Sequence, residues 1–147
     1  MEEYRNPILE SAEYWPRDTM TNSEDEYSAY FHDSGNNRAR QMHYHDYYEI
    51  TFYLGVEKIN YKTPERSYEL QRGDIVFCGM FEPHMFDCES NLLHERFIIG
   101  IDPHMMFSCS TNNCNLLSLF HRNISNYPVL HSDVWGFQKY MDLIICW

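Results

Sequence analysis

Three histidines and one glutamate are the residues of this chain best suited to chemistry. His43 and His45 stand two positions apart, Glu49 follows His45 by four positions, and His84 lies on a later segment. Neutral imidazoles and a carboxylate suit Zn, Fe, Mn or Ni, with coordination positions left open for a substrate. The same side chains can instead line a pocket and hydrogen-bond a small polar molecule without any metal. The sequence leaves both interpretations open.

The spacing of these residues restricts how they can meet. His43, His45 and Glu49 have the same parity, so a uniform strand would direct all three to one face. However, Glu49 would then lie roughly 20 Å from His43, because a strand rises about 3.3 Å per residue. A metal–ligand bond is only about 2 Å long. We therefore predict a bend between His45 and Glu49, where Asp46 is a suitable turn residue, and we expect His84 to reach the site from another strand.

Residues 27–102 are predicted to form an antiparallel β fold, either a barrel or a sandwich. Short runs suited to strands alternate with turn signals such as Ser34-Gly35-Asn36-Asn37 and Arg72-Gly73-Asp74. Closely spaced strands of this kind are typical of antiparallel sandwiches and barrels. The predicted strands cover residues 27–32, 39–45, 48–54, 57–62, 66–70, 74–78, 83–88 and 94–101.

The segments on either side of this β domain have a different character. Residues 1–26 are predicted to be an extended arm, in which Tyr14 and Trp15 are apolar anchors that could cover a pocket. Residues 103–147 are predicted to be helical. Ser132 is a credible N-cap for the last helix. A short helix before it is expected at Pro103 to Phe107.

The last helix has an apolar seam that fits either a dimer interface or packing against the chain's own barrel. Its members recur at the spacing of a helix face. The helical pattern stops at Trp147 without a C-capping signal, so the chain is expected to be one part of a longer protein. The seam consists of Val134, Phe137, Met141 and Ile144.

Charge and cysteine content restrict the class of protein. The net charge is −11, and residues 1–26 contribute −6 of it. Without a basic stripe, this chain itself is not expected to bind nucleic acid or an anionic membrane. Five cysteines, an odd number without a CxxC pair, indicate a reduced cytoplasmic protein. We find no secretory signal, and no apolar stretch approaches the roughly 20 residues that span a bilayer.

Two motifs resemble those of the cupins. The run from His43 to Ile50, which leads to Gly55, is similar to the first cupin motif. The run from Gly73 to Phe77, followed by Pro83-His84, is similar to the second. Together with the segment from His94 to Ile99, residues 27–147 resemble the N-terminal effector domain of AraC-type transcription regulators.

The resemblance implies a cupin-type antiparallel β-barrel, or jelly roll, followed by short helices and a dimerisation-type helix. It implies a homodimer that binds a sugar or a small organic acid inside the barrel. Promoter DNA would be bound only through a further domain that this chain lacks. No cofactor is expected, and the chain is predicted not to be an enzyme. Among the implied ligand-binding residues, the arginines would pair with an anionic effector, and Tyr53 and Phe86 would stack on a ring of the effector. The full implied set is His43, His45, Glu49, Tyr53, His84, Phe86, Arg38 and Arg96.

The alternative is a metal-dependent cupin enzyme, a dioxygenase or an isomerase, with His43, His45, Glu49 and His84 as ligands of a divalent metal. The chain departs from the motif of such enzymes. It has the run from Cys78 to Phe81 where many cupins have a proline-rich bend, and Cys88 where metal cupins often have asparagine. These departures favour the sensor over the enzyme.

Overall fold

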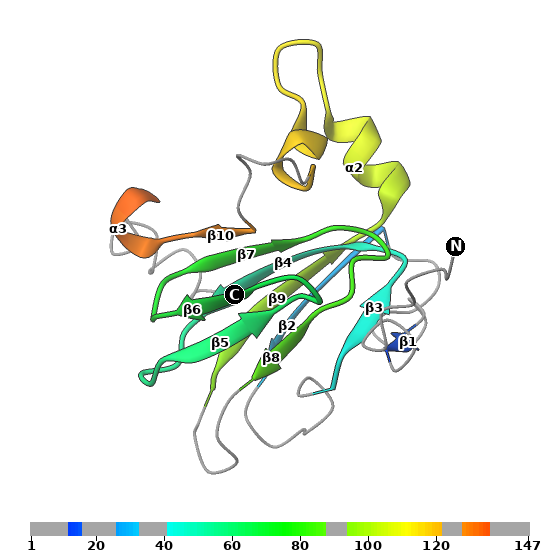
Figure 1. The fold of residues 1–147 in the computed structure, drawn as a ribbon. Coiled ribbons are helices and arrows are strands. Elements are labelled where there is room, and N and C mark those ends of the chain that lie inside the picture. Colours follow the sequence, from blue (N-terminus) through cyan, green and yellow to red (C-terminus); the bar gives the residue numbers. More distant parts are fainter. Residues whose placement is uncertain (1–11, 16–25, 33–40, 88–93, 122–127, 136–147) are drawn as a thin grey trace, which may run out of the picture.

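The computed structural model describes residues 12–15, 26–32, 41–87, 94–121 and 128–135. The main body of the described fold is two antiparallel sheets that lie face to face (Figure 1). The mainly β fold class predicted from the sequence is therefore confirmed.

The larger sheet has five antiparallel strands, in which β4 and β9 are central. Along β4 the buried side chains alternate with half-buried ones, and the buried set is Glu49, Thr51 and Tyr53. This alternation directs polar residues and a core tyrosine to the same inner face. The strand order is β10 (Val129–Leu130), β7 (Ile75–Cys78), β4 (Tyr48–Tyr53), β9 (Arg96–Ile101) and β2 (Tyr27–His32).

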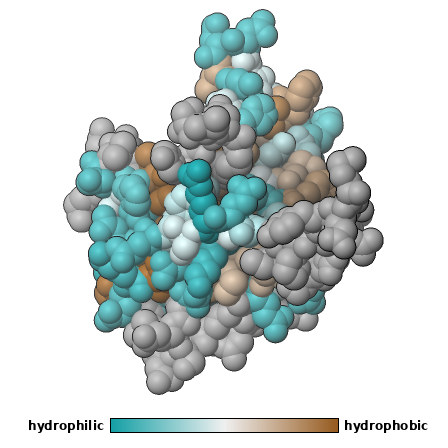
Figure 2. Space-filling model, in the orientation of Figure 1, coloured by the Kyte–Doolittle hydropathy of each residue, from teal (hydrophilic) through white to brown (hydrophobic). Residues whose placement is uncertain are grey.

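The smaller sheet has the order β6 (Ser67–Leu70), β5 (Ile59–Lys62) and β8 (Met85–Asp87). Asn60 and Glu69 of this sheet are exposed, and the view of Figure 2 is largely hydrophilic where it is coloured. Its inner side chains pack against the larger sheet, which buries apolar surface and stabilises the pair of sheets. The core cluster formed in this way consists of Tyr53, Ile59, Tyr61, Leu70, Val76, Phe86 and Val129.

A third, two-stranded sheet pairs β1 (Glu13–Trp15) with β3 (His43–His45) in parallel. The sequence did not predict β1 as a strand. All eight strands that it did predict are confirmed, and each observed strand from β2 to β9 lies within the predicted range. The predicted bend is confirmed as well, because residues 46 and 47 bend between β3 and β4.

The predicted closed barrel is not formed by the described strands, and this prediction needs correction. Closure requires a continuous hydrogen-bonded ladder around the fold, whereas the described strands divide into three separate sheets. Between β3 and the segment before β8, the ladder is reduced to one isolated bridge that pairs His43 with His84. The described part of the chain is therefore an open sandwich.

The helices are short. In α2 (Pro103–Cys109) the carboxylate of Asp102 caps the N-terminus by accepting the N–H groups of His104 and Met105. A 3-10 helix, η3 (Leu116–Leu119), follows, and both lie beyond one end of the sheets (Figure 1). None of the described helices is long and apolar enough to cross a membrane.

The predicted dimerisation helix is described only at its start, as α3 (Ser132–Trp135). Phe137, Met141 and Ile144 lie outside the described residues, and so does the side chain of Val134. The dimer seam therefore stays a prediction.

Asp74 ties the start of α3 to the larger sheet. Its side chain is fully buried. One carboxylate oxygen accepts the N–H of Ser132 at 2.8 Å, and the other accepts the N–H of Gln71 at 3.0 Å and contacts His131 Nδ1 at 3.1 Å. Gly73 just before it has φ of 92°, a conformation that favours glycine. The Gly73-Asp74 pair is thus explained by a turn and by a buried acceptor.

We predict that Asp74→Ala lowers the free energy of unfolding by about 2–3 kcal/mol, because buried N–H donors lose a charged acceptor. Asp74→Asn keeps one oxygen acceptor and should lose roughly half as much. Urea unfolding of the two variants measures the difference. An Asp74→Ala protein as stable as the wild type would contradict this role.

Candidate functional site

The short strand β3 brings two histidines into the interior. His43 and His45 are both buried, with exposed fractions of 3% and 0%. The backbone of His43 exchanges two hydrogen bonds with that of His84, at 3.0 and 2.8 Å. This bridge holds the His43 and His84 rings 4.3 Å apart and the His45 and His84 rings 5.0 Å apart, measured between centroids. Three histidines predicted to converge therefore do so.

Glu49 joins this cluster from β4, after the bend. Its Oε1 accepts a hydrogen bond from the hydroxyl of Thr51 at 2.8 Å, and its Oε2 lies 3.4 Å from His45 Nε2. Across the ladder, Glu49 stands opposite Cys78 of β7. The histidine cluster, as we use the term, consists of His43, His45, Glu49, Cys78 and His84.

Backbone carbonyls fix which ring nitrogen of each histidine carries the proton. Nδ1 lies 2.8 Å from the carbonyl of Gln41 in His43, 2.9 Å from that of Tyr47 in His45, and 2.9 Å from that of Glu82 in His84. A carbonyl can only accept, so each Nδ1 must donate and the lone pair of each neutral ring is on Nε2. Metal-binding histidines are typically oriented by such a bond from the other ring nitrogen.

Two of these Nε2 atoms, those of His45 and His84, are buried and have no hydrogen-bond partner among the residues that the structure describes. The contact between His45 Nε2 and Glu49 Oε2 is close enough for an ion pair but does not have hydrogen-bond geometry. A bare nitrogen lone pair facing a carboxylate is repulsive unless a proton or a metal ion lies between them. The contact between His45 Nε2 and Glu49 Oε2 therefore needs either a proton on Nε2 or a metal ion between the two atoms.

Burial keeps two of the histidines neutral. It lowers the pKa of His43 to about 4, and it lowers the pKa of His84 well below its usual value, aided by the neighbouring histidines. For Glu49, burial acts to raise the pKa, but the contact with His45 and the hydrogen bond from Thr51 outweigh it and the pKa is lowered. At neutral pH His43 and His84 thus offer imidazole lone pairs and Glu49 offers a negative carboxylate, which are the forms that bind cations.

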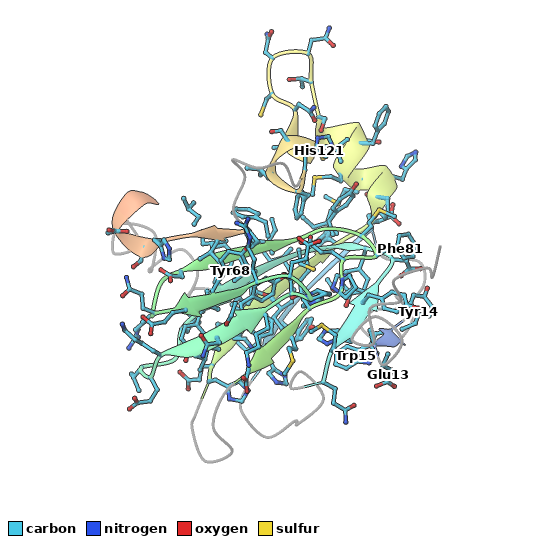
Figure 3. All side chains as sticks on the ribbon, in the orientation of Figure 1. Glu13, Tyr14, Trp15, Tyr68, Phe81 and His121 are labelled. Atoms are coloured by element: carbon cyan, nitrogen blue, oxygen red, sulfur yellow. The ribbon has the colours of Figure 1, made fainter. Side chains whose placement is uncertain are left out.

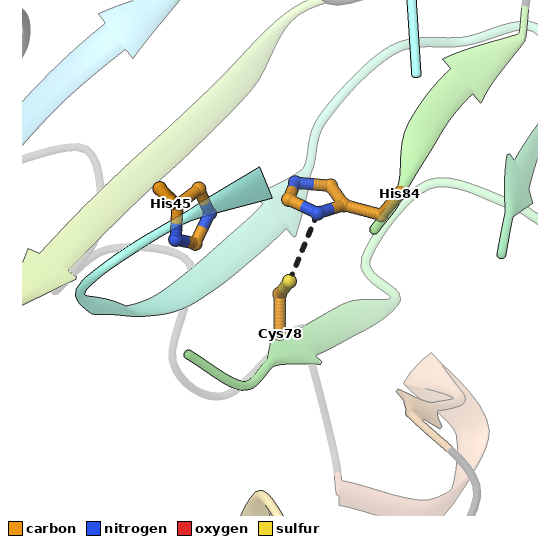
Figure 4. Close-up of side chains that lie close together, drawn as sticks. All are labelled: His45, Cys78 and His84. Carbon is orange, nitrogen blue, oxygen red and sulfur yellow. Dashed lines mark hydrogen bonds between the residues drawn. The ribbon is translucent and has the colours of Figure 1, made fainter. Parts of the chain in front are cut away.

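Cys78 is the member of the cluster that sequence reasoning missed as a candidate ligand. It is buried, its Sγ lies 3.1 Å from His84 Nδ1, and it points toward His84 in Figure 4. Ligand atoms of His45, Cys78 and His84 all lie within 4.8 Å of one another. A signal was present in the sequence, because Cys78 follows the inward-facing Val76 by two positions.

Other predicted ligand-binding residues lie in the core or outside the described part of the chain. Tyr53 and Phe86 belong to the core between the sheets, and the Tyr53 hydroxyl donates to the carbonyl of Glu57. Arg96 is buried with its guanidinium 4.2 Å from the centre of the Phe86 ring. Arg38 lies outside the described residues.

The arm strand β1 contacts the cluster directly. The Trp15 indole stacks on the His43 ring at a centroid distance of 3.7 Å and an interplanar angle of 17°. The Tyr14 hydroxyl donates to Asp46 at 2.9 Å. Figure 3 places Tyr14 and Trp15 beside β3. The arm therefore touches one of the cluster's histidines and the bend that positions Glu49.

A pocket of about 510 Å³ is lined in part by the turn that joins Cys78 to His84. Phe81 in this turn has φ of 56°, an unfavourable conformation for a side chain other than glycine, and its N–H donates to the carbonyl of His45. The pocket is lined by Tyr48, Thr63, Pro64, Glu65, Gly79, Met80, Glu82, Pro83, Phe120 and His121.

No protein-family model and no curated protein matches this chain. Similar solved structures include the polyketide cyclase RemF from Streptomyces resistomycificus, with 15% identity, a TM-score of 0.43, and coverage of 54% of this chain and 56% of RemF. A Cupin 2 conserved barrel domain protein from Salinispora arenicola has 12% identity and a TM-score of 0.40, and the match covers 57% of this chain and 70% of that protein. ToxT from Vibrio cholerae has 12% identity and a TM-score of 0.49, and the match covers 82% of this chain and 48% of ToxT. This chain spans about half the length of RemF and of ToxT, and similarities at this level identify no family.

The prediction that the chain is not an enzyme needs correction. RemF, whose structure is similar to this one, is a polyketide cyclase. A catalytic role for this chain is therefore not excluded.

We predict that the metal-free protein becomes less stable as the pH falls from about 6.5 to about 4. In the unfolded chain a histidine is protonated below about pH 6.5, whereas the buried His43 and His84 stay neutral in the folded protein because their pKa values are lowered. Each of them therefore lowers the free energy of unfolding by up to about 1.4 kcal/mol per pH unit as the pH falls. Urea unfolding in chelator across this range measures the slope. His43→Asn, whose amide can still donate to the Gln41 carbonyl, removes one titrating group and should reduce the slope; equal slopes would contradict the assignment.

Proposed function

We propose that this chain is a small-molecule-sensing domain whose binding site is built around a divalent transition metal ion in the histidine cluster. One observation supports this proposal most strongly. The Nε2 atoms of His45 and His84 are buried and have no hydrogen-bond partner among the described residues, each Nδ1 is engaged by a backbone carbonyl, and burial lowers the pKa of His84 so that its ring is neutral. Two pre-oriented imidazoles beside an ionised carboxylate are what a metal ion requires.

The residues present fit such an ion. His45 and His84 would hold it through Nε2. Of the other predicted ligands, His43 could supply a nitrogen atom and Glu49 an oxygen atom. The ion would act as a Lewis acid for the oxygen atoms of a sugar or a small organic acid. The chain's own contribution is to exclude water, because the cluster is buried, and to hold Glu49 in its anionic form.

Sensing requires that the bound and free states differ in some second contact. Trp15 offers that contact, since it stacks on His43 within the cluster. The turn from Gly79 to Pro83 offers another, because it lines the pocket and ends at His84. An effector that shifts the cluster would therefore change both the docking of β1 and the shape of this turn.

The wider proposal follows the resemblance described from the sequence. In it, the chain is the effector domain of a cytoplasmic AraC-type regulator, forms a homodimer through the seam of Val134, Phe137, Met141 and Ile144, and controls promoter DNA through a further domain. The docking of the Tyr14–Trp15 segment at the cluster supports this view, because it links the arm to the site.

We predict that the chelator-treated protein binds about one equivalent of Zn²⁺ or Co²⁺, and that binding changes the fluorescence of Trp15. In a Trp135→Phe, Trp147→Phe background Trp15 is the only tryptophan, so the signal reports the stack on His43. Elemental analysis after gel filtration gives the stoichiometry, and fluorescence titration gives the affinity.

The ligand variants are His45→Asn and His84→Asn, because asparagine can keep the bond to the backbone carbonyl and lacks Nε2. Each should lower metal affinity more than tenfold, since even partners outside the ligand shell contribute about that much. His104→Ala, which changes an exposed histidine, is the matched control and should bind like the wild type. Absence of metal binding, or binding that survives both asparagine variants, would overturn the metal site; metal binding with an unchanged Trp15 signal would overturn the sensing link.

A further inference from the structure

The pocket of about 510 Å³ is built from segments that lie far apart in the chain, and none of the residues of the histidine cluster lines it. Its walls come from the start of β4, the turn between β5 and β6, the turn after β7, and the residues that follow η3. Pockets that hold small organic molecules have volumes of roughly 300–1,000 Å³. The size therefore suits a small ligand, and the lining residues indicate its chemical class.

One wall of the pocket is aromatic. Phe120 is buried, and the centre of its ring lies 4.7 Å from that of Tyr48 and 5.8 Å from that of Phe77. These contacts hold Phe120 against β4 and β7 of the larger sheet. Met80 and Pro64 add further apolar surface to the lining. A ligand with an apolar body would bury that body here, and the faces of aromatic rings also attract cations.

Two glutamates bring negative charge to the pocket. Glu82 is half-buried, and its Oε2 accepts the N–H of Gly79 at 2.9 Å. A Cβ atom at position 79 would lie only 3.2 Å from this oxygen, so glycine lets the carboxylate fold against the backbone. Glu65 is exposed in the turn between β5 and β6, where the N–H of Thr63 donates to the carbonyl of Arg66 at 2.9 Å. Glu82 is thus held at the wall, and a hydrogen-bonded turn carries Glu65.

The described lining brings no permanent positive charge to match these carboxylates. None of the described residues that line the pocket is a lysine or an arginine, and the other titratable side chains there are Tyr48 and His121. A phenol and a neutral imidazole can each accept a hydrogen bond from a ligand. The chain as a whole has a net charge of −11, which favours the approach of cations and opposes that of anions. The pocket therefore suits a positively charged ligand.

We propose that this pocket is a second binding site, which takes an organic cation, namely a primary or quaternary ammonium group on an aromatic or other apolar body. The ammonium group is bound by the carboxylates of Glu82 and Glu65, and the apolar body packs against Tyr48 and Phe120. This site goes beyond the metal site proposed above and does not depend on it. It also selects the charge opposite to that of a small organic acid.

The turn that carries Glu82 connects the pocket to the histidine cluster. The N–H of Phe81 donates to the carbonyl of His45 at 2.7 Å, and the carbonyl of Glu82 accepts from His84 Nδ1 at 2.9 Å. A ligand bound to the Glu82 carboxylate therefore contacts the segment that positions His45 and His84.

The test compares three probes with the same phenylethyl body, bound to the full chain in the presence of chelator. The probes are 2-phenylethylammonium, which is positive, 2-phenylethanol, which is neutral, and 3-phenylpropanoate, which is negative. By isothermal titration calorimetry we expect the cation to bind at about one equivalent and at least about tenfold more tightly than the alcohol, because hydrogen bonds between charged groups are the stronger ones. We expect no binding of 3-phenylpropanoate.

The matched variants are Glu65→Gln and Glu82→Gln, which keep the shape of the side chain and remove its charge. The amide oxygen of a glutamine at position 82 can still accept the N–H of Gly79. Each variant should weaken binding of the cation by about threefold or more, and the double variant should bind it no more tightly than the alcohol. Glu95→Gln changes an exposed glutamate that does not line the pocket, and it should bind the cation like the wild type.

Several results would overturn the proposal. They are absence of cation binding to the wild type, equal affinity for the cation and the alcohol, and measurable binding of 3-phenylpropanoate. Binding of the cation that survives the double variant, or that weakens equally in Glu95→Gln, would show only attraction to an acidic surface and would overturn it as well. Should Glu82→Gln fail to fold, Glu65→Gln changes an exposed side chain and still decides the question. Because chelator is present throughout, failure of this site leaves the proposed metal site standing.

Discussion

A buried nitrogen lone pair must face a proton donor or a cation, and this constraint governs the centre of the fold. His45 and His84 each donate Nδ1–H to a backbone carbonyl, and their buried Nε2 atoms have no hydrogen-bond partner in the described part of the chain. A buried polar atom without a hydrogen bond destabilises the folded state, and the free energy of unfolding of a small domain is only about 5–15 kcal/mol. The neighbouring carboxylate of Glu49 would stabilise a cation bound at these atoms.

The architecture serves this arrangement with few contacts. One antiparallel bridge between His43 and His84 links the two-stranded sheet to the rest. The bend after His45 then returns the chain so that Glu49 stands opposite Cys78. Because the site depends on this bridge and this bend, movement of β1 or of the turn that contains Phe81 would directly change the positions of the histidine side chains.

Some of this could be predicted from the sequence because it depends on local rules. Alternation of side chains identified the strands, and the distance between His43 and Glu49 demanded the bend at Asp46 that is observed. Other features depend on tertiary contacts. The parallel pairing of Glu13–Trp15 joins segments far apart in the chain, and the burial of Arg96 over Phe86 has no local pattern. The open sandwich arises from a ladder reduced to one bridge, which no strand pattern reveals.

Anomalous diffraction at the zinc absorption edge, from crystals of the zinc-loaded chain, would show whether a metal ion occupies the histidine cluster. We expect a peak within bonding distance, about 2.0–2.3 Å, of His45 Nε2 and His84 Nε2. A peak confined to exposed side chains such as His104 or His121, with the cluster empty, would contradict it.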